Sequence, residues 1–340
     1  MRELAQRFSF SIAATVAALL AALAYGGAGA VALVAVLIGL EASISFDNAV
    51  VNASVLRRMS RAWQRVFLTL GILIAVFGMR LVFPIAIVAV ATKLGFVDVL
   101  DQALNDKDAY ARNAERAAPV IGALGGAFLM MVALTFFLDP ERELHWLAPV
   151  ERAIGRLGAV PGLPAALTAV AVLVVSQLVS PGAERDVLVA GLVGLVAYVL
   201  VHGASELLEQ RTGAAEATGA AGLGAFLYLE MLDASFSLDG VLGAFALTQD
   251  IVLIAIGLGV GAIYIRSLTI HLVRHETLSR YVYLEHGAHW AIAALAVVLF
   301  VSTEGHVPEW VTGTIGLGTV AAAFASSIAR NRRREAQGEG

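Results

Sequence analysis

The feature that most constrains this chain is an acidic eight-residue phrase that occurs twice within apolar stretches. Residues 41–48 read Glu-Ala-Ser-Ile-Ser-Phe-Asp-Asn, and residues 233–240 read Asp-Ala-Ser-Phe-Ser-Leu-Asp-Gly. The two acids, the alanine and both serines occupy matching places. A carboxylate within a membrane-spanning helix is costly unless it has a partner or a function. Two matching phrases therefore predict a duplicated fold with a polar site where its halves meet, as in transporters.

The composition supports a membrane protein. Of the 340 residues, 59% are hydrophobic and only 15% are charged, whereas a soluble domain has about a quarter of its residues charged. Many apolar stretches reach the roughly 18 residues needed to cross a bilayer. We therefore expect an all-α polytopic transmembrane helical bundle of about eight to ten spans. The chain has no cysteine, which excludes disulfides, thiolate metal sites and thiol catalysis.

The apolar stretches divide the chain into ten predicted spans, and eight or nine remain open because residues 138–204 are ambiguous. The predicted spans are 8–26, 30–55, 66–92, 117–138, 163–180, 186–204, 219–247, 250–270, 287–303 and 309–328. We interpret the first stretch as a span, because it is long for a signal peptide. Residues 97–116 are expected to form an exposed, partly helical connector, and residues 139–161 a surface crossing.

The chain is interpreted as one membrane domain, residues 1–340. Its predicted parts are a first repeat half at 8–138, a connector with one span at 139–185, a second half at 186–328 and a disordered basic tail at 329–340. Most loop arginines fall on one side if both termini are cytoplasmic, which predicts that orientation in a bacterial-type inner membrane. The first motif then runs outside to inside and the second inside to outside, so the repeat is expected to have inverted topology.

The ligands that the repeated phrase offers are all oxygen atoms. Such a set favours hard divalent cations such as Mn²⁺, Mg²⁺ and Ca²⁺, whereas copper and zinc prefer imidazole or thiolate. The candidate metal ligands are Glu41, Asp47, Asn48, Asp233, Asp239 and Glu230, with Ser43, Ser45, Ser235 and Ser237. The serines have a second interpretation, because each could bond its own helix backbone at i−4.

Two physical conditions follow for this predicted site. Glu41 and Asp47 are six residues apart and converge only if the helix breaks near the motif. Four carboxylates repel one another when the site is empty, so some must be protonated or paired with Arg80 and Arg266. Binding a dication would then release protons, which gives a route to proton exchange. The alternative interpretation, that the acids only hold helices together through arginines, explains the repetition less well.

A third polar cluster is Glu285-His286-Gly-Ala-His289 at the start of the ninth predicted span. The order differs from the zinc-protease His-Glu-x-x-His pattern, in which the Glu lies between the ligands. A metal or proton-relay site is one interpretation. An interfacial cluster that stabilises the entry to the span is the favoured one. Neither a phosphate-binding loop nor a nucleophile–base pair is present, so we expect no enzyme activity, no cofactor and no nucleic-acid partner.

The two phrases, Glu41-Ala-Ser-Ile-Ser-Phe-Asp47-Asn48 and Asp233-Ala-Ser-Phe-Ser-Leu-Asp239, resemble those of the TerC family of integral membrane proteins. That family is named for tellurium resistance and belongs to the LysE-like exporter group. The first phrase is a close match. The second departs, because Gly240 stands where the family usually has Ser, and Leu242-Gly243 replace a usual Pro-Ala. The chain looks like a divergent, longer branch of largely unassigned function.

The resemblance implies export of a divalent metal, chiefly manganese, with the motif acids as ligands. The expected partners are the lipid bilayer and the transported Mn²⁺ or a similar dication, and the oligomeric state is left open. Two alternatives remain. One is export of a small organic solute or an oxyanion, against which the excess of acids over arginines argues, since an oxyanion needs converging cations or helix N-termini. The other is a non-transporting membrane assembly or stress protein.

Overall fold

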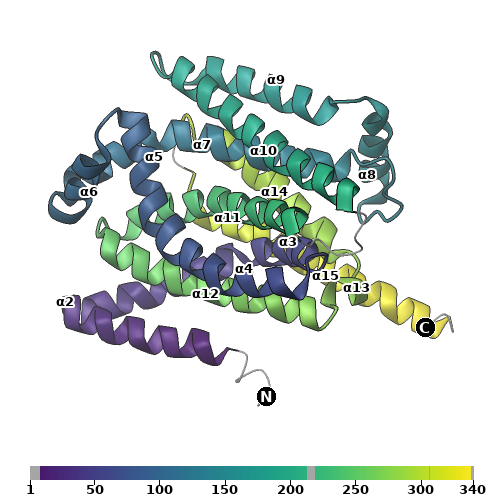
Figure 1. Ribbon diagram of the computed structural model, residues 1–340, viewed down its shortest axis with the longest axis horizontal. Coiled ribbons are helices and arrows are strands. Elements are labelled where there is room, and N and C mark those ends of the chain that lie inside the picture. The colour runs from purple at the N-terminus through teal and green to yellow at the C-terminus, as the bar shows by residue number, and fades with distance from the viewer. Residues whose placement is uncertain (1–7, 213–218, 306, 338–340) are drawn as a thin grey trace.

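The computed structural model describes residues 8–212, 219–305 and 307–337. Within these ranges, the side chains of residues 205–212, 220, 238–239, 242–243, 245–246 and 309–310 are outside the description. The described chain is a bundle of α-helices without strands (Figure 1), which confirms the expected all-α fold. The helices are α2 (Ser9–Ile44), α3 (Phe46–Leu56), α4 (Arg61–Leu73), the π-helical η1 (Ile74–Val82), α5 (Phe83–Thr92), α6 (Phe96–Asn105), α7 (Lys107–Phe137), α8 (Ala148–Gly155), the 3₁₀-helical η2 (Arg156–Ala159), α9 (Leu163–Leu178), α10 (Glu184–Thr212), α11 (Gly219–Leu247), α12 (Ile251–Arg274), α13 (Thr277–Arg280), α14 (Leu284–Val301) and α15 (Glu309–Ala336).

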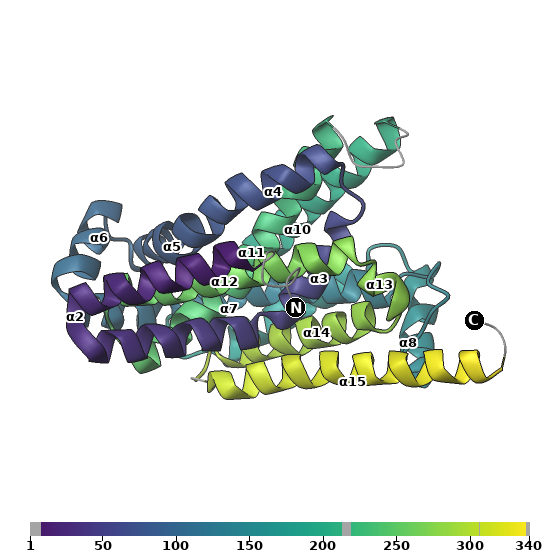
Figure 2. The same cartoon turned by 90° about the horizontal axis from the view of Figure 1, so that it is seen from below.

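Helix α2 is a hairpin of two arms that both pack on α12. The backbone leaves helical geometry at Gly26 and Gly27, and Gly27 has a φ of 70°, a conformation that glycine adopts readily. Ser11 contacts Ser267 and Tyr25 contacts Asp250, so the first arm runs antiparallel to α12. In the second arm, Leu37 lies against Gly257 and Glu41 against Gly261, so this arm runs parallel to it. The chain therefore reverses here, between the first two predicted spans (Figure 2).

The two motif helices cross in opposite directions. Leu37 belongs to the same buried cluster as Val241 and Ala244, while Asn48 and Asn52 hydrogen-bond to Asp233 further back along α11. Residue numbers thus rise along one motif segment and fall along the other. An inverted repeat requires this antiparallel relation of its corresponding helices.

The first motif lies on a broken helix and the second on an unbroken one. The second arm of α2 ends at Ile44, Ser45 is non-helical, and α3 begins at Phe46. The helix therefore breaks within the first motif, at Ser45, which is the condition under which Glu41 and Asp47 can converge. Helix α11 continues through residues 233–240, so no corresponding break occurs at Gly240.

The helix after the first motif contains a π-helical segment. Helices α4, η1 and α5 form one rod from Arg61 to Thr92, with π geometry at Ile74–Val82. π-Helical turns are rare and occur often at functional sites, because they free backbone carbonyls and re-aim side chains. Here the segment contains Arg80, and the carbonyl of Met79 accepts a hydrogen bond from Ser237 of α11. The π turn therefore connects the first half to the second motif.

Seven helices among the described residues are long and apolar enough to cross a membrane, or up to eight if the bent α8–α9 pair is one span. They indicate a multi-pass membrane protein. The sequence predicted ten spans. Three features account for the difference. The two arms of α2 count as one helix, and α9 qualifies only together with α8–η2, to which it is joined at an angle of 104°. Helix α11 is not among the helices counted.

The C-terminal tail and the crossing at 139–161 are more ordered than the sequence predicted. Helix α15 continues to Ala336, so most of the basic segment expected to be disordered is helical; residues 338–340 lie outside the described chain. Helix α6 confirms the partly helical connector at 97–116. The expected surface crossing at 139–161 contains α8, which packs against the start of α14 through Glu151, a buried carboxylate.

Candidate functional site

Glu41 of the first motif is held by an arginine from the next long helix. Its buried carboxylate forms an ion pair with Arg80 of η1 and accepts a hydrogen bond from Ser45 at 3.0 Å. A methyl group at Gly261 would lie 2.4 Å from the Glu41 Cβ, so only glycine leaves room for this side chain on α12. Gly240 of the second motif lies on the other side, where a Cβ would be 3.0 Å from Glu41 Oε2.

The first acid of the second motif has an equivalent partner. Arg266 Nη2 of α12 lies 2.5 Å from Asp233 Oδ2 and 3.1 Å from Glu230 Oε1. Its Nη1 donates to the carbonyl of Phe67 at 3.1 Å, and its guanidinium lies 4.0 Å above the Phe67 ring. Gly71 of α4 makes room for this pair, because a Cβ there would be 2.4 Å from Arg266 Nη1. In each half, the first motif acid thus pairs with an arginine on the following long helix, and a glycine of the other half lies against the ion pair, at Glu41 in one half and at Arg266 in the other.

Two asparagines of α3 complete the surroundings of Asp233. The Nδ2 groups of Asn48 and Asn52 both donate to Asp233 Oδ1 at 2.9 Å. Both side chains are buried, and neither Oδ1 atom has a hydrogen-bond donor among the described residues. A buried acceptor without a donor carries a desolvation cost of about 1–3 kcal/mol, so these two oxygens are positions where a cation would be favourable. Asn52 was missed from the sequence, although it follows Asn48 by four residues and shares its helix face.

The second acids of the two phrases are Asp47 and Asp239, and the structure describes the side chain of Asp47 alone. Asp47 is buried in the first turn of α3, where its carboxylate accepts from the backbone N–H of Asn48 at 2.9 Å. A negative charge is favoured at a helix N-terminus. A Cβ at Gly316 of α15 would be 3.4 Å from Asp47 Oδ2, so α15 covers this acid. The side chain of Asp239 is outside the described part of the structure.

The four motif serines divide between the two interpretations that the sequence left open. Ser43 is exposed and donates to the Gly39 carbonyl, and Ser235 donates to the Met231 carbonyl, so both bond their own helices. Ser45 contacts the Glu41 carboxylate, and Ser237 contacts the Met79 carbonyl of the other half. Only the second serine of each phrase therefore takes part in the polar network between the halves.

The predicted acids do not gather into a ready metal site. Among the described side chains, no three carboxylate or imidazole groups lie close enough to hold one ion. Glu41 and Asp233 are instead each bound by the guanidinium of their own half. A carboxylate buried in an apolar medium requires such compensation, which is the physical reason for the arrangement. Arg80 and Arg266 thus each form an ion pair with the first acid of one phrase.

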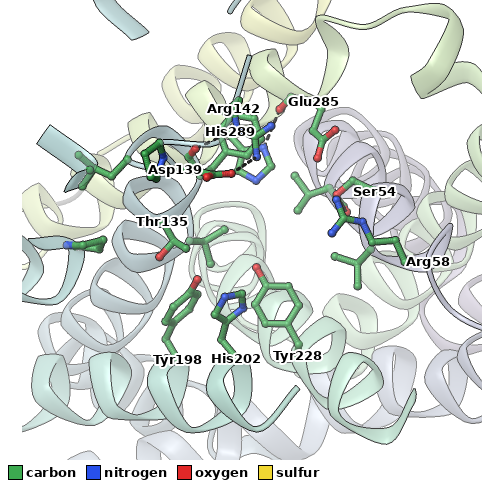
Figure 3. Close-up of a pocket in the computed structure, with 18 of the residues that line it drawn as sticks. Ser54, Arg58, Thr135, Asp139, Arg142, Tyr198, His202, Tyr228, Glu285 and His289 are labelled. Carbon is green, nitrogen blue, oxygen red and sulfur yellow. Dashed lines mark hydrogen bonds and ion pairs between the residues drawn. The ribbon is translucent and has the colours of Figure 1, made fainter. Parts of the chain in front are cut away.

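Next to this network lies a cavity of about 570 Å³ (Figure 3). Tyr198 and His202 of α10 and Tyr228 of α11 face it from one side, and Asp139, Arg142 and His289 face it from the other. Ser54 and Arg58 approach from α3 and the turn after it. The 139–161 connector, to which the sequence assigned no chemistry, supplies part of the rim. No sequence pattern indicates the cavity, because its lining comes from distant segments.

The Glu285, His286 and His289 side chains each contact a different partner. Glu285 pairs with Arg57 at 3.3 Å, and His289 stacks on Phe136 with ring centroids 3.6 Å apart. His286 Nδ1 lies 2.9 Å from Glu151 Oε2. Glu151 also accepts from the backbone N–H groups of Trp146 and Leu147 and from the Trp290 indole. These contacts connect the connector to α14, so they support the interfacial interpretation of this cluster.

Comparison with known proteins places the chain in a family whose description carries no activity. The family model described as protein of unknown function (DUF475) matches residues 46–334. The chain belongs to the DUF475 family. No curated protein and no solved structure matches it. The match begins inside the first motif, at Phe46, and the matched region of the chain includes α3, Arg80, the whole second motif and Arg266.

Proposed function

We propose that this DUF475 protein is a membrane transporter that exports a divalent cation, with manganese as the first candidate. The observation that carries the proposal is the buried network at the antiparallel crossing of the two motif segments. Carboxylates and amides of both halves meet there, beside α12, a helix of membrane-spanning length that carries Arg266. Ionisable groups in such a position line ion pathways in many membrane proteins.

The chemistry of the network suits a hard cation. Asp47, Asn48, Asn52 and Asp233 offer only oxygen to a ligand, and two of the amide oxygens are buried without donors. Manganese, magnesium and calcium prefer oxygen ligands. The resemblance of the two phrases to those of the TerC family adds manganese as substrate and export as direction. The arginine distribution of the loops predicts that both termini lie in the cytoplasm.

Arg80 and Arg266 have a defined role in this proposal. Each guanidinium neutralises a motif acid while no metal is bound. An arriving dication would compete with Arg266 for Asp233 and would turn the Asn48 and Asn52 amides so that their oxygens face the ion. Glu230, which shares Arg266 with Asp233, would take up or release the proton that balances this exchange.

The test is manganese transport by purified protein in lipid vesicles. We expect the wild-type chain to move Mn²⁺, and Asp47→Asn, Asp233→Asn and Asp239→Asn each to lose at least about tenfold in rate, because each removes a charged oxygen ligand. Asp98→Asn is the matched control, since Asp98 is an exposed acid on α6. Normal transport by the three site variants would refute the site, and no transport by wild type would refute manganese as the substrate.

One observation favours a second candidate, the export of a small organic solute or oxyanion. The cavity of about 570 Å³ exceeds what a bare ion needs, and Arg58 and Arg142 are among its lining residues. The same vesicles distinguish the two functions. An organic-anion transporter would move a small carboxylate or tellurite without Mn²⁺, and its transport would depend on Arg58 and Arg142 rather than on Asp233.

A further inference from the structure

We infer that the cavity of Figure 3 is a water-filled vestibule through which the solute reaches the buried network from the cytoplasmic side. The inference deepens the proposed function by assigning the route of entry. It depends on the positions of the lining residues, on their charges and on the volume of the cavity.

The helices that carry the buried network also form the floor of the cavity. Val51 lines it from α3, three residues after Asn48, and Tyr228 lines it from α11, five residues before Asp233. At a rise of about 1.5 Å per residue, these separations are roughly 5 and 8 Å along the helix axes. The floor is therefore within about one and a half helical turns of the network.

The lining has the character of a hydrated passage for a cation. It contains two carboxylates, Asp139 and Glu285, and two guanidiniums, Arg58 and Arg142. It therefore has no net formal charge while its histidines are neutral, and it does not exclude a dication. Hydroxyls of Ser54, Thr135 and the two tyrosines offer further polar contacts. At about 30 Å³ per molecule of liquid water, the volume admits on the order of ten waters or more, enough for a hydrated ion.

The rim places the opening on one side of the membrane. Arg58 follows α3, and Arg142 and Gly158 belong to the connector between α7 and α9. These segments are the arginine-rich loops that the positive-inside rule assigns to the cytoplasm. The opening is thus on the side from which an exporter collects its substrate.

The test uses the fact that the chain has no cysteine. Single cysteines are introduced as Thr135→Cys in the wall and Val51→Cys in the floor, and a membrane-impermeant, positively charged thiosulfonate is applied to either side of sealed vesicles. Leu173→Cys, exposed on the outer surface of α9, is the lipid-facing control. Asp108→Cys, exposed at the start of α7 on the predicted outer side, is the control for sidedness.

Both cavity cysteines should react from the cytoplasmic side at least about tenfold faster than Leu173→Cys, because only a thiol in water ionises and meets the reagent. Adding Thr135→Trp to the Val51→Cys chain should slow the floor reaction at least about tenfold by filling the passage. Labelling of Asp108→Cys from the opposite side, unchanged by Thr135→Trp, shows that the plugged protein keeps its orientation in the membrane, and an unchanged Tm in detergent shows that it is folded.

Unreactive cavity cysteines, reaction from the outer side, or a floor reaction that the tryptophan leaves unchanged would each overturn the vestibule. Labelling needs no transport, so the two proposals fail separately. Fast, plug-sensitive labelling in a protein that moves no manganese would refute the proposed substrate and support the vestibule. Manganese transport that persists in the protein with Thr135→Trp would show that the ion enters elsewhere.

Discussion

Replacing Arg266 by methionine tests whether the guanidinium compensates the buried acids. Arg266 is 1% exposed, and its Nη2 lies 2.5 Å from Asp233 and 3.1 Å from Glu230. Arg266→Met keeps a long side chain but leaves both carboxylates without their cation. Breaking a buried ion pair by removing one partner costs about 3–5 kcal/mol. The unfolding entropy scales with chain length, so this loss corresponds to a fall in Tm on the order of 5 °C for a chain of this size.

The assay is thermal unfolding of purified protein in detergent, arranged as a double-mutant cycle. Asp233→Asn removes one of the two charges that Arg266→Met strands. The double variant should therefore recover at least about 1.5 kcal/mol relative to the sum of the single effects. The Glu41 and Arg80 pair provides the matched cycle in the other half, with Glu41→Gln and Arg80→Met. Equal destabilisation by Arg266→Met with and without Asp233→Asn would refute charge compensation.

The same variant connects stability to the proposed transport. If the guanidinium competes with the cation for Asp233, its removal should raise the affinity of the folded protein for Mn²⁺. Added Mn²⁺ should then raise the Tm of Arg266→Met more than that of wild type, since ligand stabilisation grows logarithmically with the ratio of ligand concentration to Kd. A Tm that Mn²⁺ leaves unchanged in both proteins would contradict the assignment of the network as a cation site.

Three further predictions concern stability, each measured as the Tm of purified protein. Asp250 caps α12; burial alone would raise its pKa, but hydrogen bonds from Lys107, the Leu253 N–H and Tyr25 outweigh burial and lower it. A lowered pKa adds stability that is present above the unfolded value of about 3.9 and is lost as pH falls through the folded value. The wild-type Tm should therefore fall more than that of Asp250→Asn between about pH 6 and about pH 3, and equal falls would contradict this. Gly261→Ala places a methyl group 2.4 Å from the Glu41 Cβ and should cost about 1–3 kcal/mol; Gly39→Ala, with open space around it, is the control and should be nearly neutral. Glu151→Ala strands the N–H groups of Trp146, Leu147 and Trp290 and should cost about 1–3 kcal/mol, whereas the exposed Glu143→Ala should not, and equal Tm values would show that the connector is not held through Glu151.

Much of the polar network was predictable because it uses side chains that a membrane segment seldom contains. The repeated phrase indicated two motif helices, and the span count predicted that they run in opposite directions. Arg80 and Arg266 were identifiable as partners because a lone arginine in an apolar stretch needs an anion. The Gly26–Gly27 reversal falls between the first two predicted spans, since glycine permits the positive φ that the turn requires.

The remainder of the network depends on distances between helices, which a single sequence does not contain. The π-helical segment has no signature in Ile74–Val82, because its extra residue is accommodated by packing rather than by a residue type. Gly71 and Gly261 are ordinary helix glycines in sequence, and only the structure shows the guanidinium and carboxylate against them. The pairing of His286 with Glu151 links residues 135 positions apart, which no local spacing in the sequence indicates.

The two halves are similar in their ion pairs and different in their backbones, and this difference bears on how a transporter would work. The first motif is interrupted at Ser45, which offers a hinge between α2 and α3. The second motif lies on the unbroken α11, which holds Asp233 and Glu230 in fixed relation to Arg266. A cation that binds between the halves would therefore meet a rigid acid pair on α11 and a movable set of oxygens on α3. The residues that move should be Asp47, Asn48 and Asn52, because they lie on α3, beyond the break. Ser45→Ala favours helical geometry at this position and should join α2 and α3 into one rigid helix. The variant should consequently lose more of its transport rate than of its affinity for Mn²⁺. An equal loss of both would place Ser45 among the ligands.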